Sequence, residues 1–257
     1  MEITGRQILI TGANRGVGRA FAKMCAENKA HLHLVVRAED ANLVDELKSE
    51  GAKSVTIWIT DLSKRESVNS LLSQLQGTQI DILFNNAGQL TGGLLESQPI
   101  DEICEMIQVN VSSLIQLTHG LLPGMLERKR GKIINVSSIT AFMDLPANST
   151  YAATKAAVAA FTQSLRVELK GTGVTTLLLV PPGIKTRMYD KVMAAFGSVI
   201  ELPDKSLPPS QYVKMVREAI LHDLEVLKPS GMAGVVLKAA KFAKPVFDFE
   251  IGRRFHR

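Results

Sequence analysis

Aromatic residues, cysteines and long apolar runs are all scarce in this sequence, and each scarcity argues against a class of function. Aromatic side chains make up 5% of the 257 residues. So few stacking platforms disfavour a nucleic-acid-binding protein. The two cysteines, Cys25 and Cys104, lack the spacing of a zinc site or a redox pair, so we expect reduced packing residues and no metal site.

No apolar run approaches the roughly 18 residues of a membrane-spanning helix, and no basic-then-apolar leader opens the sequence. We therefore expect a soluble, cytoplasmic protein. There is also no linker rich in proline, glycine or serine and no internal repeat, so residues 1–257 are interpreted as a single domain.

Excess charge is confined to the C-terminal extension, residues 228–257. Seven of the 30 Lys and Arg residues but only two of the 25 Asp and Glu residues lie there, which accounts for the net charge of +5. Val235, Val236 and Ala240 share one side of an expected helix that Pro245 should end. A basic amphipathic helix can lie on a membrane surface, but packing against the body or a second subunit is favoured.

What the sequence does contain is a regular alternation of short aliphatic runs and amphipathic segments. This pattern predicts an α/β fold, a doubly wound (Rossmann-like) parallel sheet with helices on both faces. In such folds ligands bind at the carboxyl ends of the strands. The expected strands are 7–10, 31–36, 55–59, 80–84, 132–137 and 174–180.

A glycine-rich turn, TGANRGVG at 11–18, joins the first strand to the first helix. Its glycines follow the spacing G-x-x-x-G-x-G, and free N–H groups at a helix N-terminus can hold a pyrophosphate. A plain strand-to-helix turn is the alternative. The residues predicted to bind a dinucleotide here are Gly12, Asn14, Arg15, Gly16, Val17 and Gly18.

The residue after the second strand is Arg37, where an acidic residue would bind the 2′-hydroxyl of an NAD ribose. Arg15 and Arg37 together suit a 2′-phosphate, which favours NADP(H) over NAD(H). Glu39 and Asp40 follow closely and keep NAD(H) open, and both arginines could simply be solvated surface charges.

Two further strand ends carry polar residues. Asp61 and Leu62 follow the third strand, where Asp61 could cap the next helix. Asn85-Asn86-Ala87-Gly88 follows the fourth strand. Its carboxamides can stabilise the central sheet, and its glycine lets a cofactor approach the backbone, with an Asn/Gly turn as the alternative.

A helix is predicted over 99–122, and Asn110 falls within its apolar stripe. A buried carboxamide costs free energy unless it is hydrogen-bonded, so Asn110 must have partners, and on its own it would more often be structural than catalytic. The stripe consists of Ile103, Ile107, Leu114, Leu117 and Leu121.

Tyr151 and Lys155 are four residues apart on a predicted helix and therefore share a face. A neighbouring ammonium is expected to lower the pKa of the phenol from about 10 toward a range useful for acid/base catalysis. Ser137 and Ser138 end the fifth strand, and strand alternation places them on opposite faces.

Taken in order, these motifs resemble the short-chain dehydrogenase/reductase family from residue 5 to about residue 190. The resemblance implies a catalytic tetrad of Asn110, Ser138, Tyr151 and Lys155, with Asp61 near the adenine. It also implies a homodimer or homotetramer through the helices of Asn110 and Tyr151. The extension is weakly similar to that of steroid and retinoid reductases. Further implied cofactor-binding residues are Leu62, Asn86, Ala87, Gly88, Pro181, Gly183, Ile184 and Thr186.

The segment Pro181-Pro182-Gly183 departs from the P-G-x-V-x-T pattern of that family by one residue, which weakens the implied nicotinamide contacts of Ile184 and Thr186. Residues 187–210 are apolar and break the alternation, as expected of a lid over a lipophilic substrate or of a surface helix.

The function expected is therefore NADP(H)-dependent interconversion of a ketone or aldehyde with an alcohol. Two alternatives remain. One is a cofactor-binding sensor or scaffold without turnover. The other is an epimerase or dehydratase, which the glycine spacing disfavours.

Overall fold

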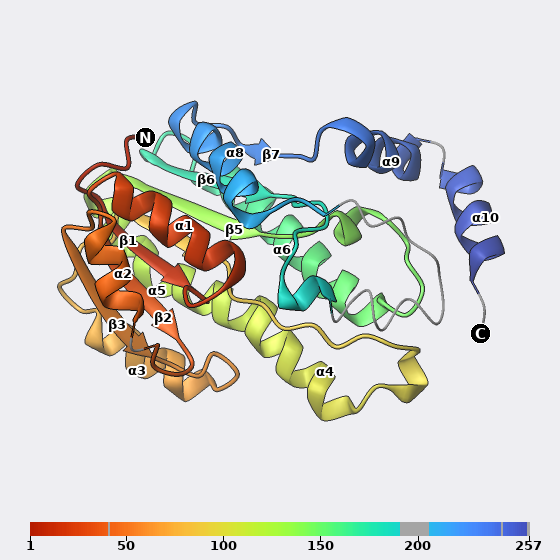
Figure 1. Ribbon diagram of the computed structural model, residues 1–257, viewed down its shortest axis with the longest axis horizontal. Coiled ribbons are helices and arrows are strands. Elements are labelled where there is room, and N and C mark those ends of the chain that lie inside the picture. Colours follow the sequence, from red (N-terminus) through yellow and green to blue (C-terminus); the bar gives the residue numbers. More distant parts are fainter. Residues whose placement is uncertain (41, 191–205, 243, 256–257) are drawn as a thin grey trace.

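The computed structural model describes residues 1–40, 42–190, 206–242 and 244–255, and it is built on a parallel sheet (Figure 1). The strands pair in the order β3-β2-β1-β4-β5-β6-β7, so the chain reverses direction across the sheet between β1 and β4. This confirms the doubly wound fold. The strands are β1 (Gln7–Thr11), β2 (His31–Val36), β3 (Ser54–Ile59), β4 (Ile82–Asn85), β5 (Gly131–Val136), β6 (Val174–Leu179) and β7 (Val226–Leu227).

Helices cover both faces of the sheet, because alternate strand residues point to opposite sides. Ile8 and Ile10 pack with α1, α2 and α8, whereas Leu9 packs with α3, α5 and α6. The helices are α1 (Gly16–Glu27), α2 (Leu43–Ser49), α3 (Arg65–Gln74), α4 (Ile100–Ile107), α5 (Ser113–Glu127), α6 (Ser149–Glu168), α8 (Pro209–Leu221), α9 (Gly231–Phe242) and α10 (Lys244–Arg254).

The helix expected over 99–122 is in fact two α-helices joined by a π-helical turn, Gln108–Ser112. It also continues past Pro123 to Glu127, since Leu117 and Met125 bury its face on both sides of the proline. Ile107 was wrongly placed in the buried stripe: its side chain is 44% exposed, and Met106 takes the buried position.

Two further expectations, for Cys104 and for the apolar side of the extension, are wrong about which side chains are buried. Cys25 is buried as expected, but Cys104 is exposed on α4 and is not a packing residue. In the extension, Val235 is 59% exposed whereas Ala240 is buried, so the expected apolar side is not one buried face. The helix α9 ends at Phe242, three residues before Pro245, in line with the expectation. Pro245 itself is the second residue of α10, where its missing N–H has no partner to lose.

The extension is attached to the body through α9, whose Leu237 packs against a small cluster on α6 and β6, while α10 lies at the far end of the molecule from α2 and α3 (Figure 1). No helix in the described part of the chain is long and apolar enough to cross a membrane.

An ion pair between a buried lysine and an exposed aspartate lies at the amino-terminal end of β5, away from the glycine turn. The ammonium of Lys132 on β5 is fully buried and donates to Asp223 Oδ1 at 2.6 Å and to Thr175 Oγ1 at 3.0 Å. The hydrogen bond from Lys132 lowers the pKa of Asp223. This carboxylate therefore stabilises the fold above its ordinary pKa of 3.8 and loses that effect as pH falls through its lower folded-state pKa.

Replacing Asp223 with Asn should lower the free energy of unfolding at pH 7 by about 1–3 kcal/mol, because a buried ammonium loses its charged acceptor. The difference between variant and wild type should shrink as pH falls through the lowered folded-state pKa of Asp223, where wild-type Asp223 also becomes neutral. Urea unfolding at pH 7 and over a series of acidic pH values measures this. Glu168→Gln, at an exposed site, serves as control, and equal effects of the two substitutions would contradict the assignment.

Candidate active site

The carboxyl ends of β1 and β4 are tied together by side-chain hydrogen bonds. Thr11 Oγ1 accepts from the main-chain N–H of Asn86 at 3.0 Å and of Ala87 at 2.9 Å. In return, Asn86 Nδ2 donates to the carbonyl oxygens of Thr11 at 2.9 Å and Gly12 at 3.3 Å. The predicted Asn/Gly motif therefore lies against the glycine turn, at the crevice where ligands bind in such sheets.

The glycine turn requires glycine at each of its three positions. Gly12 and Gly16 have φ angles of +66° and +54°, in the left-handed region. A Cβ on Gly18 would lie 2.2 Å from Gly12 O and 2.6 Å from Asn86 Nδ2. The first turn of α1 has no acidic side chain. This tight cradle at a helix N-terminus fits a dinucleotide pyrophosphate.

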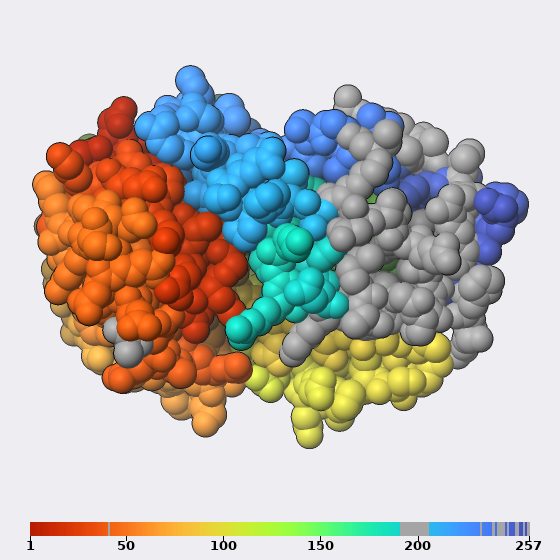
Figure 2. Space-filling view, viewed as in Figure 1, coloured from red at the N-terminus to blue at the C-terminus, as the bar shows by residue number. Residues whose placement is uncertain are grey.

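The loop that follows β6 packs against the glycine turn. A Cβ on Gly16 would lie 3.1 Å from Thr186 Cγ2, and Figure 2 shows the segment around residues 181–190 against the N-terminal region. Ile184 is buried and forms a parallel bridge with Leu207. That bridge joins the segment just before the expected lid, 187–210, to the C-terminal part of the lid. Residues 191–205 of the lid lie outside the described residues.

The side chain of Asn110 links two segments of the site through hydrogen bonds. It lies in the π-helical turn and is 1% exposed. Its Oδ1 accepts from Gln89 N at 2.8 Å, and its Nδ2 donates to Gln89 O at 2.9 Å and to Thr154 Oγ1 at 3.0 Å. The expectation that this carboxamide has partners is confirmed. Asn110 thereby joins the segment after β4 to α6.

Tyr151, Lys155 and Ser138 meet at the first turns of α6. Tyr151 is buried, and Ser138 hydrogen-bonds to its phenol. Lys155 Nζ lies 5.6 Å from the centroid of the Tyr151 ring and donates to Val136 O at 3.0 Å. A Cβ on Gly88 would lie 3.6 Å from both Asn110 Oδ1 and Lys155 Nζ. The structure thus brings the four predicted catalytic residues together beside Gly88.

The two serines after β5 point in opposite directions, as strand alternation predicts. Ser137 is buried and its Oγ donates to Lys155 O at 2.7 Å. Ser138 Oγ faces the phenol and also accepts from Thr140, from N at 3.2 Å and Oγ1 at 2.9 Å. Of the two serines, Ser138 is therefore the one that contacts Tyr151.

The expected pKa shift of Tyr151 is wrong in direction. Burial raises the pKa of this phenol above its ordinary value, and the hydrogen bond with Ser138 only partly opposes the rise. Burial also lowers the pKa of Lys155 to about 8. The ammonium lies over the face of the ring and is held by Val136 O, so it does not offset the desolvation of the phenol. Tyr151 is consequently protonated at neutral pH.

Asp61 does not cap α3, although capping was the role that the sequence alone favoured. Its Oδ1 accepts from Ser63 N at 3.1 Å and Ser63 Oγ at 2.7 Å, forming a local turn before the helix begins at Arg65. The hydrogen bond from the Ser63 side chain is the main cause that lowers the pKa of Asp61, and Arg37 adds a smaller electrostatic effect. Leu62 is a buried core residue, and Arg37 is exposed.

Sequence reasoning missed the residues that hold the site in place. Gln98 is buried and bridges two segments: its Nε2 donates to Gly93 O at 2.6 Å, and its Oε1 accepts from Thr150 Oγ1 at 2.8 Å. Thr154 supports Asn110. A lone Gln or Thr in a loop or helix carries no pattern that could have identified either role.

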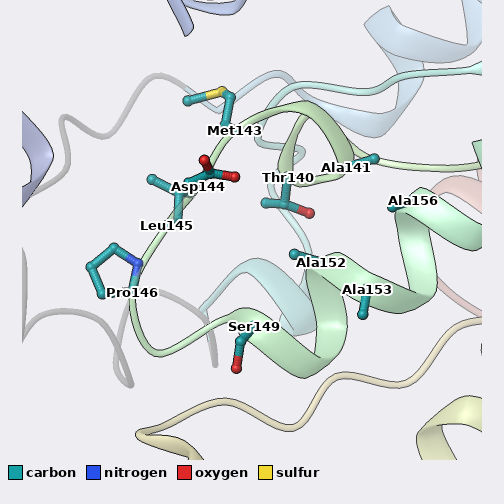
Figure 3. A pocket seen from close by; sticks show the side chains of 10 residues that line it. All are labelled: Thr140, Ala141, Met143, Asp144, Leu145, Pro146, Ser149, Ala152, Ala153 and Ala156. Atoms are coloured by element: carbon teal, nitrogen blue, oxygen red, sulfur yellow. The ribbon is translucent and has the colours of Figure 1, made fainter. Parts of the chain in front are cut away.

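A cavity of about 450 Å³ lies between the short helical turn that follows Ser138 and the start of α6 (Figure 3). In Figure 3, Met143 to Pro146 form one wall, and Thr140 faces Ala152. The lining is largely apolar. It consists of Thr140, Ala141, Met143, Asp144, Leu145, Pro146, Ser149, Ala152, Ala153 and Ala156.

Comparison with known proteins identifies the family. The family model described as short chain dehydrogenase matches residues 6–195. The chain is 35% identical over 193 residues to a short chain dehydrogenase of Pseudocercospora fijiensis (strain CIRAD86), which covers 73% of this chain and 62% of that protein. The chain thus spans less than two thirds of the length of this relative. It belongs to the short chain dehydrogenase family.

Two further similarities bear on the site. The chain is 34% identical over 189 residues to the 3-oxoacyl-acyl-carrier-protein reductase FabG of Vibrio harveyi, covering 73% of this chain and 77% of that protein. A crystal structure of a putative NAD(P) dependent gluconate 5-dehydrogenase from Beutenbergia cavernae with bound NADP superposes with a TM-score of 0.78 and 26% identity. It covers 88% of this chain and 96% of that one.

Gly18→Ala should destabilise the protein by about 1–3 kcal/mol, because the new Cβ overlaps main-chain atoms of the turn. It should also abolish detectable binding of NADPH. Gly252→Ala is the matched control, since a Cβ there meets nothing within 4 Å. Thermal unfolding and nicotinamide fluorescence measure the two effects, and a Gly18→Ala protein as stable as the control would contradict the geometry.

The depressed pKa of Lys155 predicts a pH-dependent stability. Between about pH 8 and 10 the unfolded chain holds the proton of this lysine while the folded protein has lost it, so the unfolding free energy rises with pH. Lys155→Met lacks this contribution, and its stability relative to wild type should fall over the same range. Parallel profiles of unfolding free energy against pH would contradict the assignment.

Proposed function

We propose that this protein is an NADP(H)-dependent oxidoreductase that interconverts a lipophilic ketone or aldehyde with the corresponding alcohol. The observation that carries the proposal is the convergence of Asn110, Ser138, Tyr151 and Lys155 beside Gly88, next to a glycine cradle that fits a dinucleotide. Family membership and the 34% identity to a 3-oxoacyl reductase support the reaction class.

The nicotinamide, when bound, supplies or accepts the hydride. Ser138 and Tyr151 then donate hydrogen bonds to the carbonyl oxygen, where negative charge develops, and are preorganised by their own contact. Tyr151 is protonated at neutral pH and transfers its proton to that oxygen. Asn110 Oδ1 accepts one hydrogen bond, from Gln89, and so retains a lone pair for a water that resupplies protons through Lys155.

NADP(H) is preferred to NAD(H) on the charges around the ribose site. Arg15 and Arg37 are both exposed, at the N-cap of α1 and at the end of β2. Asp40, which kept NAD(H) open from the sequence, forms an ion pair with Arg19 at 2.7 Å. The NADP-bound structure at 26% identity supports the same cofactor.

A lipophilic substrate agrees with the cavity between the turn that follows Ser138 and the start of α6. Its lining is mostly alanine, leucine, methionine and proline, and it includes neither Ser138 nor Tyr151. A homodimer or homotetramer in the cytoplasm completes the proposal. Its interface would use the outer faces of α5 and α6, where Ile115 and Val167 are exposed.

Tyr151→Phe should lower kcat by about 10²–10⁴, the usual contribution of a general acid. The assay follows nicotinamide absorbance with NADPH or NADH against small aldehydes, diketones, and steroid, retinoid and 3-oxoacyl carbonyls. Wild-type turnover with NADPH that disappears in the variant is the expected result. NADPH binding without turnover on any carbonyl would contradict the proposal in favour of a sensor.

The neighbouring serines provide a matched pair for the same assay. Ser138→Ala should lower kcat by about 10²-fold, because one donor to the developing oxyanion is lost. Ser137→Ala removes a hydrogen bond to Lys155 O and should lower the unfolding free energy by about 1 kcal/mol. The reverse ranking of the two variants in kcat would show that Ser138 is not the catalytic serine.

A further inference from the structure

Arg19 on α1 connects three segments around the cofactor site. Its Nη1 donates to Asp40 Oδ2 at 2.7 Å and to Asn14 O at 3.3 Å, and its Nη2 pairs with Glu46 of α2. Asn14 belongs to the glycine turn, and Asp40 lies in the segment that follows β2. The side chains of Arg19, Asp40 and Glu46 are between 23% and 31% exposed. One guanidinium therefore holds the turn against the segment that borders the ribose.

The pairing of Arg19 with Asp40 also determines which charged side chains of the segment 37–40 can act on a bound cofactor. Arg37 and Glu39 are exposed, whereas Asp40 is paired with Arg19. Hydrogen bonds and electrostatic attraction to Glu46 and Asp40 raise the pKa of Arg19, so this cation is permanent. Glu46, which shares Arg19, is also paired with Lys23. With Asp40 paired, the exposed side chains at this border are the cations Arg15 and Arg37 and the single carboxylate of Glu39.

We propose that Arg19 is a specificity-determining residue: by pairing with Asp40 it prevents this carboxylate from repelling the 2′-phosphate of NADP(H), and so sets the preference over NAD(H). The proposal rests on the proposed cofactor. A 2′-phosphate carries close to two negative charges at neutral pH, and a free carboxylate in the same segment would oppose it. NAD(H) has no such phosphate and is insensitive to the pair.

Lys23 offers a matched control one helical turn further along α1. It also pairs with Glu46, at 2.6 Å, and with Glu50. Within the described residues, neither of these ion-pair partners lies in the segment 37–40. Lys23→Gln therefore removes the same unit of charge from the same helix and leaves Asp40 paired. A nonspecific electrostatic effect would appear in both variants.

The experiment is a titration of nicotinamide fluorescence with NADPH and with NADH, which requires no substrate. Arg19→Gln should lower the ratio of NADPH to NADH affinity by about tenfold, and Lys23→Gln should leave it within about twofold. Adding Asp40→Asn to Arg19→Gln should restore the ratio, because the unpaired carboxylate is gone. Arg19→Lys, which keeps the charge but not the planar fork, should fall between wild type and Arg19→Gln.

Equal shifts in Arg19→Gln and Lys23→Gln would overturn the proposal, as would a double variant that stays at the level of Arg19→Gln. Thermal unfolding of each variant identifies any that do not fold, and Arg19→Lys then carries the comparison. A wild-type protein that prefers NADH would instead overturn the proposed cofactor, and the role of Arg19 with it. If the wild type prefers NADPH and the Arg19 variants keep the same affinity ratio, only the role of Arg19 is overturned.

Discussion

The site depends on one buried carboxamide, that of Asn110. Its three hydrogen bonds fix the backbone of Gln89 on one side and Thr154 of α6 on the other. A buried polar atom of this carboxamide that lost its partner would lower the free energy of unfolding by about 1–3 kcal/mol. The two segments are therefore held in a single arrangement. The π-helical turn over 108–112 aims this side chain inward, as such turns often do at functional sites.

The end of β4 is the place where the two halves of the site meet. Asn86 hydrogen-bonds to the main chain of the glycine turn, and three residues later Gln89 is held by Asn110. The glycine turn and the cluster around Asn110 and Lys155 are thus positioned by one short stretch of backbone. Gly88 lies between them and leaves room for a reacting group, since a side chain there would contact both Asn110 and Lys155.

Most of the fold could be predicted because aliphatic runs between amphipathic segments report the strands directly. The two-residue strand β7 is too short to give a pattern. The exposure of Ile107 and Cys104 depends on tertiary packing around the π-helical turn, which periodicity does not record. The family resemblance implied the four residues that the structure brings together, but the direction of the Tyr151 pKa shift was not predictable, because burial outweighs the hydrogen bond with Ser138.

The proposed reaction is direct hydride transfer between nicotinamide and a carbonyl carbon at this site. It is tested with NADPH deuterated at the transferred position of C4, the best carbonyl substrate, and mass spectrometry of the alcohol. The product should carry one deuterium on its carbinol carbon, and no deuterium should appear in the solvent. Product without deuterium, or cofactor that is regenerated without net consumption as in an epimerase, would contradict it.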